Sequence, residues 1–363
     1  MLWAKDFPEA RLALAGFVHP GMKHAIAGRA IELGIPLLEG LQLRRHFHLG
    51  SIFRDVGLLA SWIDQGEVDL LHCHQAGDHL VAALALQVSH RKVPLLRTVW
   101  GEGDLHPGPR QWIAFSATTA LSYPLPRLAS RLQAMGKARG DSLLSLTPPP
   151  VDLALPTLAS PEPARAKLRA RLGLQKGTPI VVLTARIQRR RRWGLAWEAF
   201  AALQKNLPGA RLVILGRPDE GVLEEVCERP LAALGLQDRV LFPGYLRGES
   251  YAEALAGADA FLFLVPGSDA TCRALREAML LGLPVVAPED RGFDQLIDPG
   301  RTGLLVAPNP EAIAGALALL LKDRPRARRL GQAASREVQN WDSQGKTALR
   351  SLYARLLPQE GRG

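Results

Sequence analysis

The sequence is poor in the features that mark several protein classes. Its 363 residues contain only three cysteines (Cys73, Cys227 and Cys272), and their spacing fits neither a zinc site nor a disulfide framework. The chain is therefore expected in a reducing cytoplasm. Apolar runs such as residues 259–265 are far shorter than the roughly 20 residues of a membrane span. Acidic residues occur early in residues 1–20, so we expect no secretory signal there.

Composition and charge narrow the possible partners. Hydrophobic residues make up 47% and charged residues 22%, which is typical of a globular chain and excludes a disordered one. The 45 Lys and Arg residues exceed the 35 Asp and Glu residues, for a net charge of +10. A basic surface suits nucleotides, anionic lipid headgroups or nucleic acid, and charge alone does not choose among them.

Short apolar runs alternate with helical stretches along the chain, which indicates parallel sheets with crossover helices. Residues 146–151 contain three consecutive prolines, which make this segment stiff and extended. We predict a domain boundary there. We expect two doubly wound α/β domains, 1–150 and 151–344, and a final helix in 345–363 that packs back toward the first domain. The predicted strands are 11–16, 36–41, 68–72, 93–98, 179–184, 211–215, 240–242, 260–264 and 284–287. Helical material is expected up to about residue 137, and separate helices at 324–338 and 345–357.

The most informative stretch runs from residue 261 to residue 287. A buried strand is expected to end at Val265, and a helix to begin near Ala270 or Thr271. Asp269 can cap the free amides of that helix start, and the amides with the helix dipole form an anion site. Glu277 follows eight residues later, a little over two turns, so both carboxylates face the same way. Such a loop can hold a diphosphate while the carboxylates bind hydroxyls, which is the chemistry of a nucleotide sugar.

A second cluster of charge lies at the end of the first strand of the second domain. The strand ends at Arg186, and a helix is expected from Trp193. Arg186 and at least one residue of the run Arg189–Arg192 would lie at the same edge of the sheet. Guanidinium groups there could neutralise a leaving diphosphate without a metal, because they bind phosphate oxygens in a bidentate manner.

These motifs, in this order, resemble the donor domain of the retaining glycosyltransferases of family 4, which have the GT-B fold. The resemblance covers about residues 179–357 and extends more loosely to 68–74 and 94–100. It rests on Arg186 and Arg191, Glu198-Ala199-Phe200, Leu215-Gly216, Phe242-Pro243-Gly244, Ala258-Asp259-Ala260, Asp269 with Glu277, and Gly282-Leu283-Pro284-Val285-Val286. Two features depart from the family pattern: Asp269 replaces a Glu, and Trp100 stands where members often carry a His. A third concerns the first domain, in which we expect the opening strand, Gly-rich loop and helix of the family to be missing.

The resemblance implies two Rossmann-like domains facing across a cleft. It also implies transfer of a sugar from a nucleotide-diphosphate sugar with retention, without metal or cofactor. The implied catalytic residues are Asp269, Arg186 and Arg191, to which we add His74 because it ends a strand. The implied donor-binding residues are Gly216, Tyr245, Leu246, Arg247, Gly267, Ser268, Ala270, Thr271, Cys272 and Glu277. On the acceptor side we expect Trp100, Gly101 and Glu102.

Several functions remain open at this stage. The leading hypothesis is transfer of a sugar to an envelope glycan or a lipid-linked acceptor. The basic net charge would favour binding at the inner face of a membrane. The alternative is a degenerate relative that binds a sugar nucleotide or a partner without turnover. A sugar-nucleotide epimerase on the same fold is a further possibility. Nucleic-acid binding is disfavoured because no recognised module is present. The pair His72 and His74 lacks further ligands for a metal.

Overall fold

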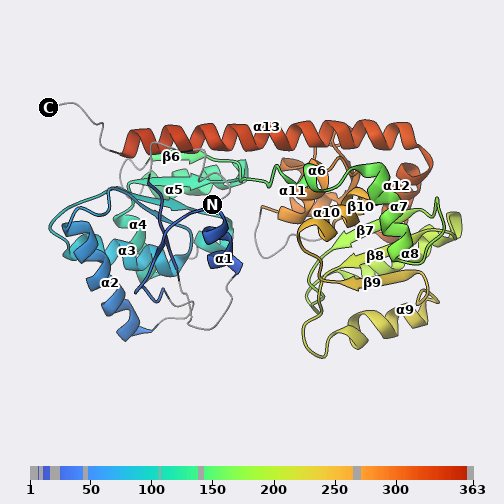
Figure 1. The fold of residues 1–363 in the computed structure, drawn as a ribbon, viewed down its shortest axis with the longest axis horizontal. Helices are drawn as coiled ribbons and strands as arrows, with labels where there is room; N and C mark the ends of the chain where they lie inside the picture. The colour runs from blue at the N-terminus through green and yellow to red at the C-terminus, as the bar shows by residue number, and fades with distance from the viewer. Residues whose placement is uncertain are drawn as a thin grey trace. The chain divides into compact units, whose positions relative to one another are not determined.

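The computed structural model describes residues 7, 11–16, 25–43, 48–105, 108–137, 143–264 and 271–357. It divides the chain into two compact units (Figure 1). The first unit consists of Met1–Pro150 together with Trp341–Gly363, and the second is Val151–Asn340. Each unit is built on a parallel sheet, as the alternating pattern predicts, and each is described by itself below.

The second unit contains a six-stranded parallel sheet in the order β12-β11-β10-β7-β8-β9. Its strands are β7 (Ile180–Thr184), β8 (Arg211–Leu215), β9 (Val240–Gly244), β10 (Ala260–Leu262), β11 (Val285–Pro288) and β12 (Leu304–Val306). In this sheet the chain first forms β7, then adds β8 and β9 on one side of it, and then adds β10 on the other side. This reversal is the topological switch point of a doubly wound sheet, outside which such folds bind their ligands.

Helices cover both faces of this sheet. They are α6 (Leu155–Leu158), α7 (Pro161–Arg171), α8 (Trp193–Asn206), α9 (Arg229–Ala233), α10 (Gly248–Ala256), α11 (Arg273–Leu280), α12 (Pro310–Lys322) and the start of α13 (Arg324–Leu356). One π-helical turn, Glu224–Glu228, precedes α9, and short 3-10 turns occupy Glu289–Arg291 and Phe293–Gln295.

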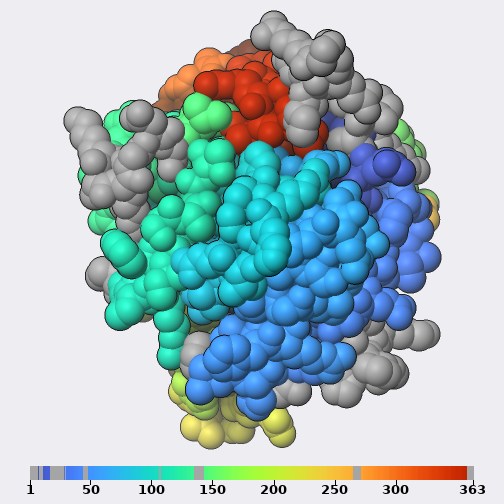
Figure 2. Space-filling model, turned by 90° about the vertical axis from the view of Figure 1, so that its left-hand side faces the viewer, coloured from blue at the N-terminus to red at the C-terminus, as the bar shows by residue number. Residues whose placement is uncertain are grey.

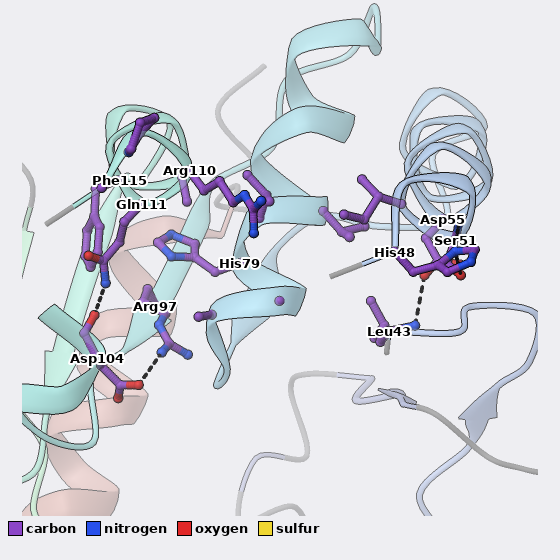
Figure 3. Close-up of a pocket in the computed structure, with 18 residues that line it drawn as sticks. Leu43, His48, Ser51, Asp55, His79, Arg97, Asp104, Arg110, Gln111 and Phe115 are labelled. Carbon is purple, nitrogen blue, oxygen red and sulfur yellow. Dashed lines mark hydrogen bonds and ion pairs between the residues drawn. The ribbon is translucent and has the colours of Figure 1, made fainter. Parts of the chain in front are cut away.

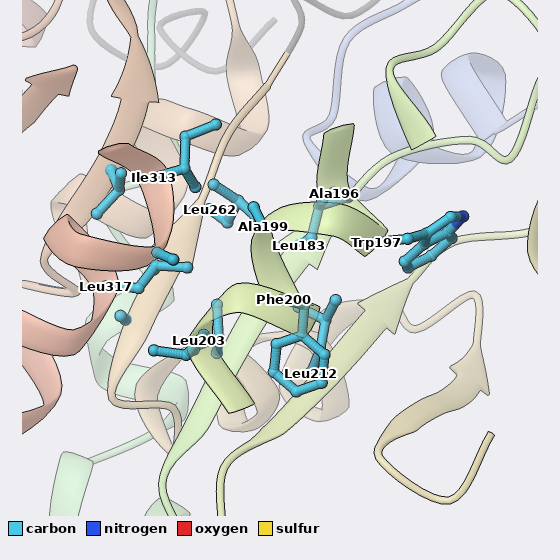
Figure 4. Packing of buried hydrophobic residues seen from close by; sticks show 14 of the residues in the cluster. Leu183, Ala196, Trp197, Ala199, Phe200, Leu203, Leu212, Leu262, Ile313 and Leu317 are labelled. Carbon is cyan, nitrogen blue, oxygen red and sulfur yellow. The ribbon is translucent and has the colours of Figure 1, made fainter. Parts of the chain in front are cut away.

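The core of the second unit lies between the sheet and the helices α8 and α12 (Figure 4). Leu183, Leu212 and Leu262 point from three adjacent strands toward Phe200 of α8 and Leu317 of α12. Each of these side chains is nearly or fully buried, and burial of one such group contributes about 1.5–3 kcal/mol. This core holds the carboxyl ends of the strands in place.

The first unit contains a four-stranded parallel sheet, β3-β4-β5-β6, and a separate pair, β1-β2. The strands are β1 (Leu14–Ala15), β2 (Leu37–Leu38), β3 (Leu71–Cys73), β4 (Leu95–Thr98), β5 (Ala120–Tyr123) and β6 (Leu143–Leu146). The helices are α1 (Ala25–Glu32), α2 (Leu49–Asp64), α3 (Ala76–Val88), α4 (Pro109–Ser116) and α5 (Ala129–Lys137). Short 3-10 turns span Glu102–Leu105 and Pro126–Leu128.

The two faces of the first sheet are covered by different elements. Leu95 faces a cluster built from α2, α3 and α4, and these helices occupy much of the blue and cyan surface in Figure 2. Leu96, one residue later, faces the opposite side, because side chains alternate along a strand. There it packs against Leu352 and Tyr353 in the last turns of α13. The end of α13 therefore completes the core of the first unit.

The structure differs from the predicted elements in three ways. Helical material was expected up to residue 137, but Ala120–Tyr123 within it is the strand β5. The strands β6 and β12 were not predicted, because runs of three or four apolar residues are too short to show a period. The two predicted helices 324–338 and 345–357 are one continuous helix, α13. Residues 339–344 contain weak helix formers but no proline, so nothing there ends the helix.

Candidate functional site

The carboxyl ends of the strands in the second unit bring several predicted residues to one edge of the sheet. Arg186 follows β7, Gly216 follows β8, and Tyr245 to Arg247 follow β9. All these strands are parallel, so the segments that follow them lie at the same edge. The backbone pairing of β7 and β8 continues past the strands through a bridge between Ile187 and Pro218, which fixes this edge.

Gly216 lies at the closest approach between two of these segments. Its amide donates to the carbonyl of Gly244 at 3.1 Å. A Cβ added at this position would lie 1.9 Å from the carbonyl oxygen of Ala185, so any other residue would displace backbone. The predicted donor-site glycine is therefore required by packing between the ends of β7 and β8.

Arg186 is held by a carboxylate that the sequence analysis did not identify as part of the site. Its Nε lies 2.7 Å from Oδ1 of Asp219, and the Arg186 side chain remains about half exposed. Gln188 donates to the other oxygen of Asp219 at 2.9 Å. The hydrogen bond from Gln188, and then the charge of Arg186, lower the pKa of Asp219. Asp219 therefore stays ionised and orients the guanidinium at the sheet edge.

The four arginines of the predicted run have different surroundings. Arg189 forms an ion pair with Glu225 at 2.6 Å, and Arg192 one with Asp290 at 2.5 Å. Arg191 is half-buried and lines a small hollow at the switch point, beside Thr184 of β7 and Leu264 just after β10. Desolvation, and then the charge of Arg190, lower the pKa of Arg191. Arg192 lines the same hollow, so Arg191 and Arg192 are the two members of the run that reach it.

Glu277 is buried, with a relative exposure of 5%, on α11. The hydroxyl of Tyr251 donates to its Oε2 at 3.0 Å, and Nε of Arg273 lies 2.7 Å from its Oε1. Burial, and then the charge of Glu277, raise the pKa of Tyr251 well above its usual value, so Tyr251 remains a donor. Each carboxylate oxygen can accept a second hydrogen bond, so Glu277 is held in one orientation and can still bind hydroxyls.

The start of α11 differs slightly from the predicted position. The helix begins at Arg273, after Cys272, which adopts a left-handed conformation with φ 52°. Thr271 and Cys272 are both buried. The buried guanidinium of Arg276 donates from Nε to the carbonyl of Thr271 at 2.8 Å and pins this turn. The other predicted residues of the loop, Gly267, Ser268, Asp269 and Ala270, lie outside the described residues.

The remaining donor-site residues lie in the turn between β9 and α10. The ring of Tyr245 is largely exposed, and the guanidinium carbon of Arg247 lies 4.9 Å from its centroid. Leu246 is half-buried between them. This turn offers a flat, cationic surface next to Gly216, of the kind on which an aromatic base stacks.

In the first unit, the predicted histidine belongs to a ring cluster. The ring of His74 stacks on Trp100 with centroids 5.8 Å apart and lies 4.3 Å from the ring of His72. His72 in turn bonds to Thr98 at 2.7 Å and to Tyr353 at 2.8 Å. Although His74 is accessible to solvent, desolvation by the surrounding protein and then the charge of Arg97 lower its pKa to about 4. His74 is therefore neutral at neutral pH and can accept a proton or a hydrogen bond.

Of the other two predicted acceptor-side residues, Glu102 begins the 3-10 turn after β4, and Gly101 immediately precedes it. The carbonyl of Gly101 accepts from Asp104, whose carboxylate in turn accepts from the amide of Trp100 at 2.8 Å. Glu102 is exposed and forms an ion pair with Arg131 at 3.0 Å. These contacts fix the turn, and Asp104 is the member that the sequence analysis did not select.

The described residues lack a metal-binding cluster and a membrane-spanning helix. No cluster of three or more His, Cys, Asp or Glu side chains in the described ranges could hold a metal ion. Over the same ranges, none of the helices combines the length and apolar character needed to cross a bilayer.

Comparison with known proteins shows what the second unit is similar to. Residues 164–337 match the family model of the glycosyl transferases group 1. The matched residues fill nearly all of the second unit, so the similarity to this family is carried by the second unit.

Two curated relatives match part of the chain. The D-inositol 3-phosphate glycosyltransferase of Nocardia farcinica is 36% identical over 173 residues, which are 46% of this chain and 38% of the relative. The GDP-mannose-dependent alpha-(1-6)-phosphatidylinositol monomannoside mannosyltransferase of Mycolicibacterium smegmatis is 30% identical over 191 residues, 50% and 49% of the two chains. The chain thus spans half or less of the length of these relatives.

The fold itself matches over nearly the whole chain. The crystal structure of Anabaena Alr3699/HepE in complex with UDP and glucose superposes with a TM-score of 0.74 at 19% identity, and covers 97% of this chain and 94% of that one. The expected GT-B fold, with two Rossmann-like units on parallel sheets, is therefore confirmed.

Proposed function

We propose that this protein is a glycosyltransferase that moves a sugar from a nucleoside-diphosphate sugar to an acceptor hydroxyl, with retention at the anomeric carbon and without a metal. The proposal rests on the family match of residues 164–337 together with the groups gathered at the carboxyl edge of the second sheet. That edge carries two arginines, a close-packed glycine and a buried, oriented carboxylate, the set of groups that a nucleotide sugar requires.

Each group has a physical role in this proposal. Arg186 and Arg191 stabilise the charge that develops on the leaving diphosphate, because preorganised cations act most strongly where water is excluded. Glu277 accepts hydrogen bonds from the ribose hydroxyls, and Asp269 from the sugar hydroxyls. Gly216 lets the nucleotide approach the backbone, and the Tyr245–Arg247 turn lies beside the base.

The relatives suggest the chemistry of the acceptor. Both curated relatives are named for acceptors or products that contain inositol and phosphate. We therefore propose a phosphate-bearing polyol as acceptor, either free or as the headgroup of a membrane lipid. A lipid acceptor would place the protein at the cytoplasmic face of a membrane.

The donor site is tested first by thermal unfolding of the full-length chain with UDP-, GDP-, ADP- and dTDP-sugars. A ligand at about 100 times its dissociation constant stabilises the folded state by about 2.7 kcal/mol. We expect one nucleotide to raise the melting temperature and the Asp269→Ala variant to lose that shift. No shift with any of the four would contradict the donor site.

Turnover is then measured as transfer or hydrolysis of the sugar nucleotide that binds. Glu277→Gln should lower kcat/KM by about 100-fold, because a buried acceptor of several hydrogen bonds is lost. Glu224→Gln, an exposed carboxylate in the same unit, is the matched control and should keep full activity. A nucleotide that binds at Glu277 but is never turned over, with any acceptor, would instead support the non-catalytic alternative.

A further inference from the structure

The first unit encloses a cavity that the donor site does not use. It has a volume of about 590 Å³ and lies between α2, α3 and α4 (Figure 3). Figure 3 shows Ser51 and Asp55 of α2 on one side of it, and Arg97, Asp104 and Gln111 on the other. A volume of roughly 300–1,000 Å³ is typical of small-ligand sites.

A buried cation reaches this cavity from the sheet. Arg97 belongs to β4, lines the cavity and has a relative exposure of only 1%. Its Nη2 lies 3.2 Å from Oδ1 of Asp104. Its Nη1 is buried and has no hydrogen-bond partner within the described part of the chain. A buried guanidinium nitrogen without an acceptor costs free energy, so the site favours a ligand that supplies one.

The acidic side chains of the cavity do not supply that acceptor. Both carboxylate oxygens of Asp55 accept backbone amides, from Gln42 at 2.9 Å and from Leu43 at 2.8 Å. Asp104 gives one oxygen to the amide of Trp100 at 2.8 Å and the other to Nη2 of Arg97. The acids are therefore committed to protein donors, while Nη1 of Arg97 has no acceptor among the described residues.

A second set of donors lies in the cavity wall. Ala76 and Gly77, the first two residues of the 13-residue helix α3, line the cavity. The Gln75 side chain caps the amide of Asp78, and the Asp78 carboxylate accepts from the amide of Gln75 at 2.9 Å. The amides of Ala76 and Gly77, at the first two helical positions, have no acceptor within the helix. The exposed side chain of Arg110 adds a further cation to the lining. Arg97 and α3 thus present donors of two kinds to one space.

The rest of the lining is mainly apolar. Ile52, Leu80, Ala114 and Phe115 contribute to it from the three helices. A ligand that fits this wall combines an anionic group with a carbon-rich body. A phosphate ester suits it better than a carboxylate, because a phosphate offers enough oxygens to accept from Arg97 and from helix amides at once.

We propose that this cavity binds the phosphate group of the acceptor, with Nη1 of Arg97 and the first turn of α3 as its donors. The inference rests on the proposed function, which supplies the reason for a phosphate-bearing acceptor. It assigns acceptor specificity to Arg97, a residue that lies outside the donor unit. The phosphate comes either from a soluble phosphorylated polyol or from a lipid headgroup, and both present the same chemistry to Arg97.

The test measures binding to the full-length protein without any nucleotide sugar, so that it does not depend on the donor site. The probes are inorganic phosphate and inositol 3-phosphate by calorimetry, and vesicles of phosphatidylinositol or of phosphatidylcholine by cosedimentation. We expect Arg97→Met to weaken the binding of inositol 3-phosphate or of phosphatidylinositol vesicles at least tenfold. Binding of the soluble ester identifies a free polyol phosphate, and binding of phosphatidylinositol vesicles alone identifies a headgroup.

Three further variants separate a binding role from a structural one. Asp104→Asn should tighten phosphate binding, because it removes the charge that partly neutralises Arg97, whereas a purely structural ion pair would only be weakened. Leu80→Trp should fill the cavity and abolish binding while Arg97 is kept. Arg91→Met, which removes an ion pair with Asp69 outside the cavity, is the matched control and should bind normally.

The proposal is overturned if none of the probes binds, or if Arg97→Met and Leu80→Trp, both folded by circular dichroism, bind as tightly as the parent protein. A protein that binds and turns over a sugar nucleotide but shows no phosphate binding would overturn this inference alone. A protein that binds phosphate through Arg97 but no nucleotide sugar would overturn the proposed function and leave the cavity as a phosphate site.

Discussion

At the scale of single residues, the candidate site depends on side chains that orient the predicted ligand-binding side chains. Asp219 orients Arg186 through a 2.7 Å ion pair, and Tyr251 and Arg273 orient Glu277. Asp219, Tyr251 and Arg273 stood out in no sequence motif, because their role follows from contacts across the fold. Such contacts restrict the rotamers of Arg186 and Glu277 before a ligand binds, which reduces the entropy lost on binding.

Gly216 provides the sharpest test at this scale. Gly216→Ala should lower the free energy of unfolding by about 1–3 kcal/mol and weaken nucleotide binding, because the new Cβ would collide with the carbonyl of Ala185. Urea unfolding and the nucleotide thermal shift measure the two effects. Gly209→Ala is the control, since a Cβ there meets nothing within 4 Å. Equal stability of the two variants would show that the ends of β7 and β8 can separate freely.

The two clustered histidines should make stability depend on pH. Burial, and then the charge of His74, lower the pKa of His72 well below its usual value, and the pKa of His74 is lowered to about 4. Between pH about 6.5 and 4, the unfolded chain therefore binds more protons than the folded one. The free energy of unfolding should fall as the pH is lowered through this window.

Urea midpoints measured between pH 7.5 and 4.5 test this prediction. A double variant, His72→Gln with His74→Gln, should show a shallower dependence on pH. His90→Gln, at an exposed position just after α3, is the control and should keep the parent slope. The same slope in the double variant would assign the dependence to other groups.

At the scale of elements, one buried carboxylate joins three parts of the second unit. Asp259, just before β10, forms ion pairs with Arg165 and Arg169 of α7 and with Arg324 at the start of α13. It also accepts the amide of Ile180, the first residue of β7, at 2.8 Å. Asp259 thus positions two helices against the two strands of the switch point.

Loss of this carboxylate should be costly. Asp259→Asn should reduce the free energy of unfolding by about 3–5 kcal/mol, because it leaves the buried guanidinium of Arg169 without its counter-charge. Asp298→Asn is the control, since Asp298 and its partner Arg301 are both about half exposed. Denaturant unfolding compares the two. A difference of less than 1 kcal/mol between them would show that Asp259 does not anchor α7 and α13.

At the scale of the whole molecule, the first unit is discontinuous in sequence. The helix α13 begins in the second unit at Arg324 and ends in the first at Leu356. Its last turns bury Leu352, Tyr353 and Leu356 against strands of the first sheet. The folding of the first unit therefore depends on residues more than 200 positions downstream of its sheet.

A charge introduced into these last turns should unfold one unit selectively. Leu352→Asp places a carboxylate in an apolar site of 3% exposure, at a cost of several kcal/mol. Hydrogen exchange should then lose protection across β3 to β6, while β7 to β12 remain protected. Ser351→Asp, at the exposed neighbouring position, is the control. Loss of protection in both units would show that they unfold as one.

The sequence determined much of the architecture because the relevant signals are local. Alternating apolar runs predicted two parallel-sheet domains, and Asp269, Glu277 and the arginines after the strand at 179–184 indicated the donor chemistry. Glu277 could be selected from its spacing after Asp269, whereas Gly216 was selected through the family resemblance. The strand β5 was assigned to a helix and β6 was missed, because runs this short carry no period that separates a strand from a helix or a loop.

Only the tertiary structure decided which of these groups act together. Asp219 contacts Arg186, Tyr251 contacts Glu277, and Arg97 lines a cavity between helices. Each residue lies on a different element from what it contacts, so no local sequence pattern marks it. Burial at a given strand position is set by what packs across it, which is why Arg97 lines a cavity while its neighbour Leu96 packs against α13. Sequence periodicity fixes which face a residue occupies, and the fold alone fixes what that face meets.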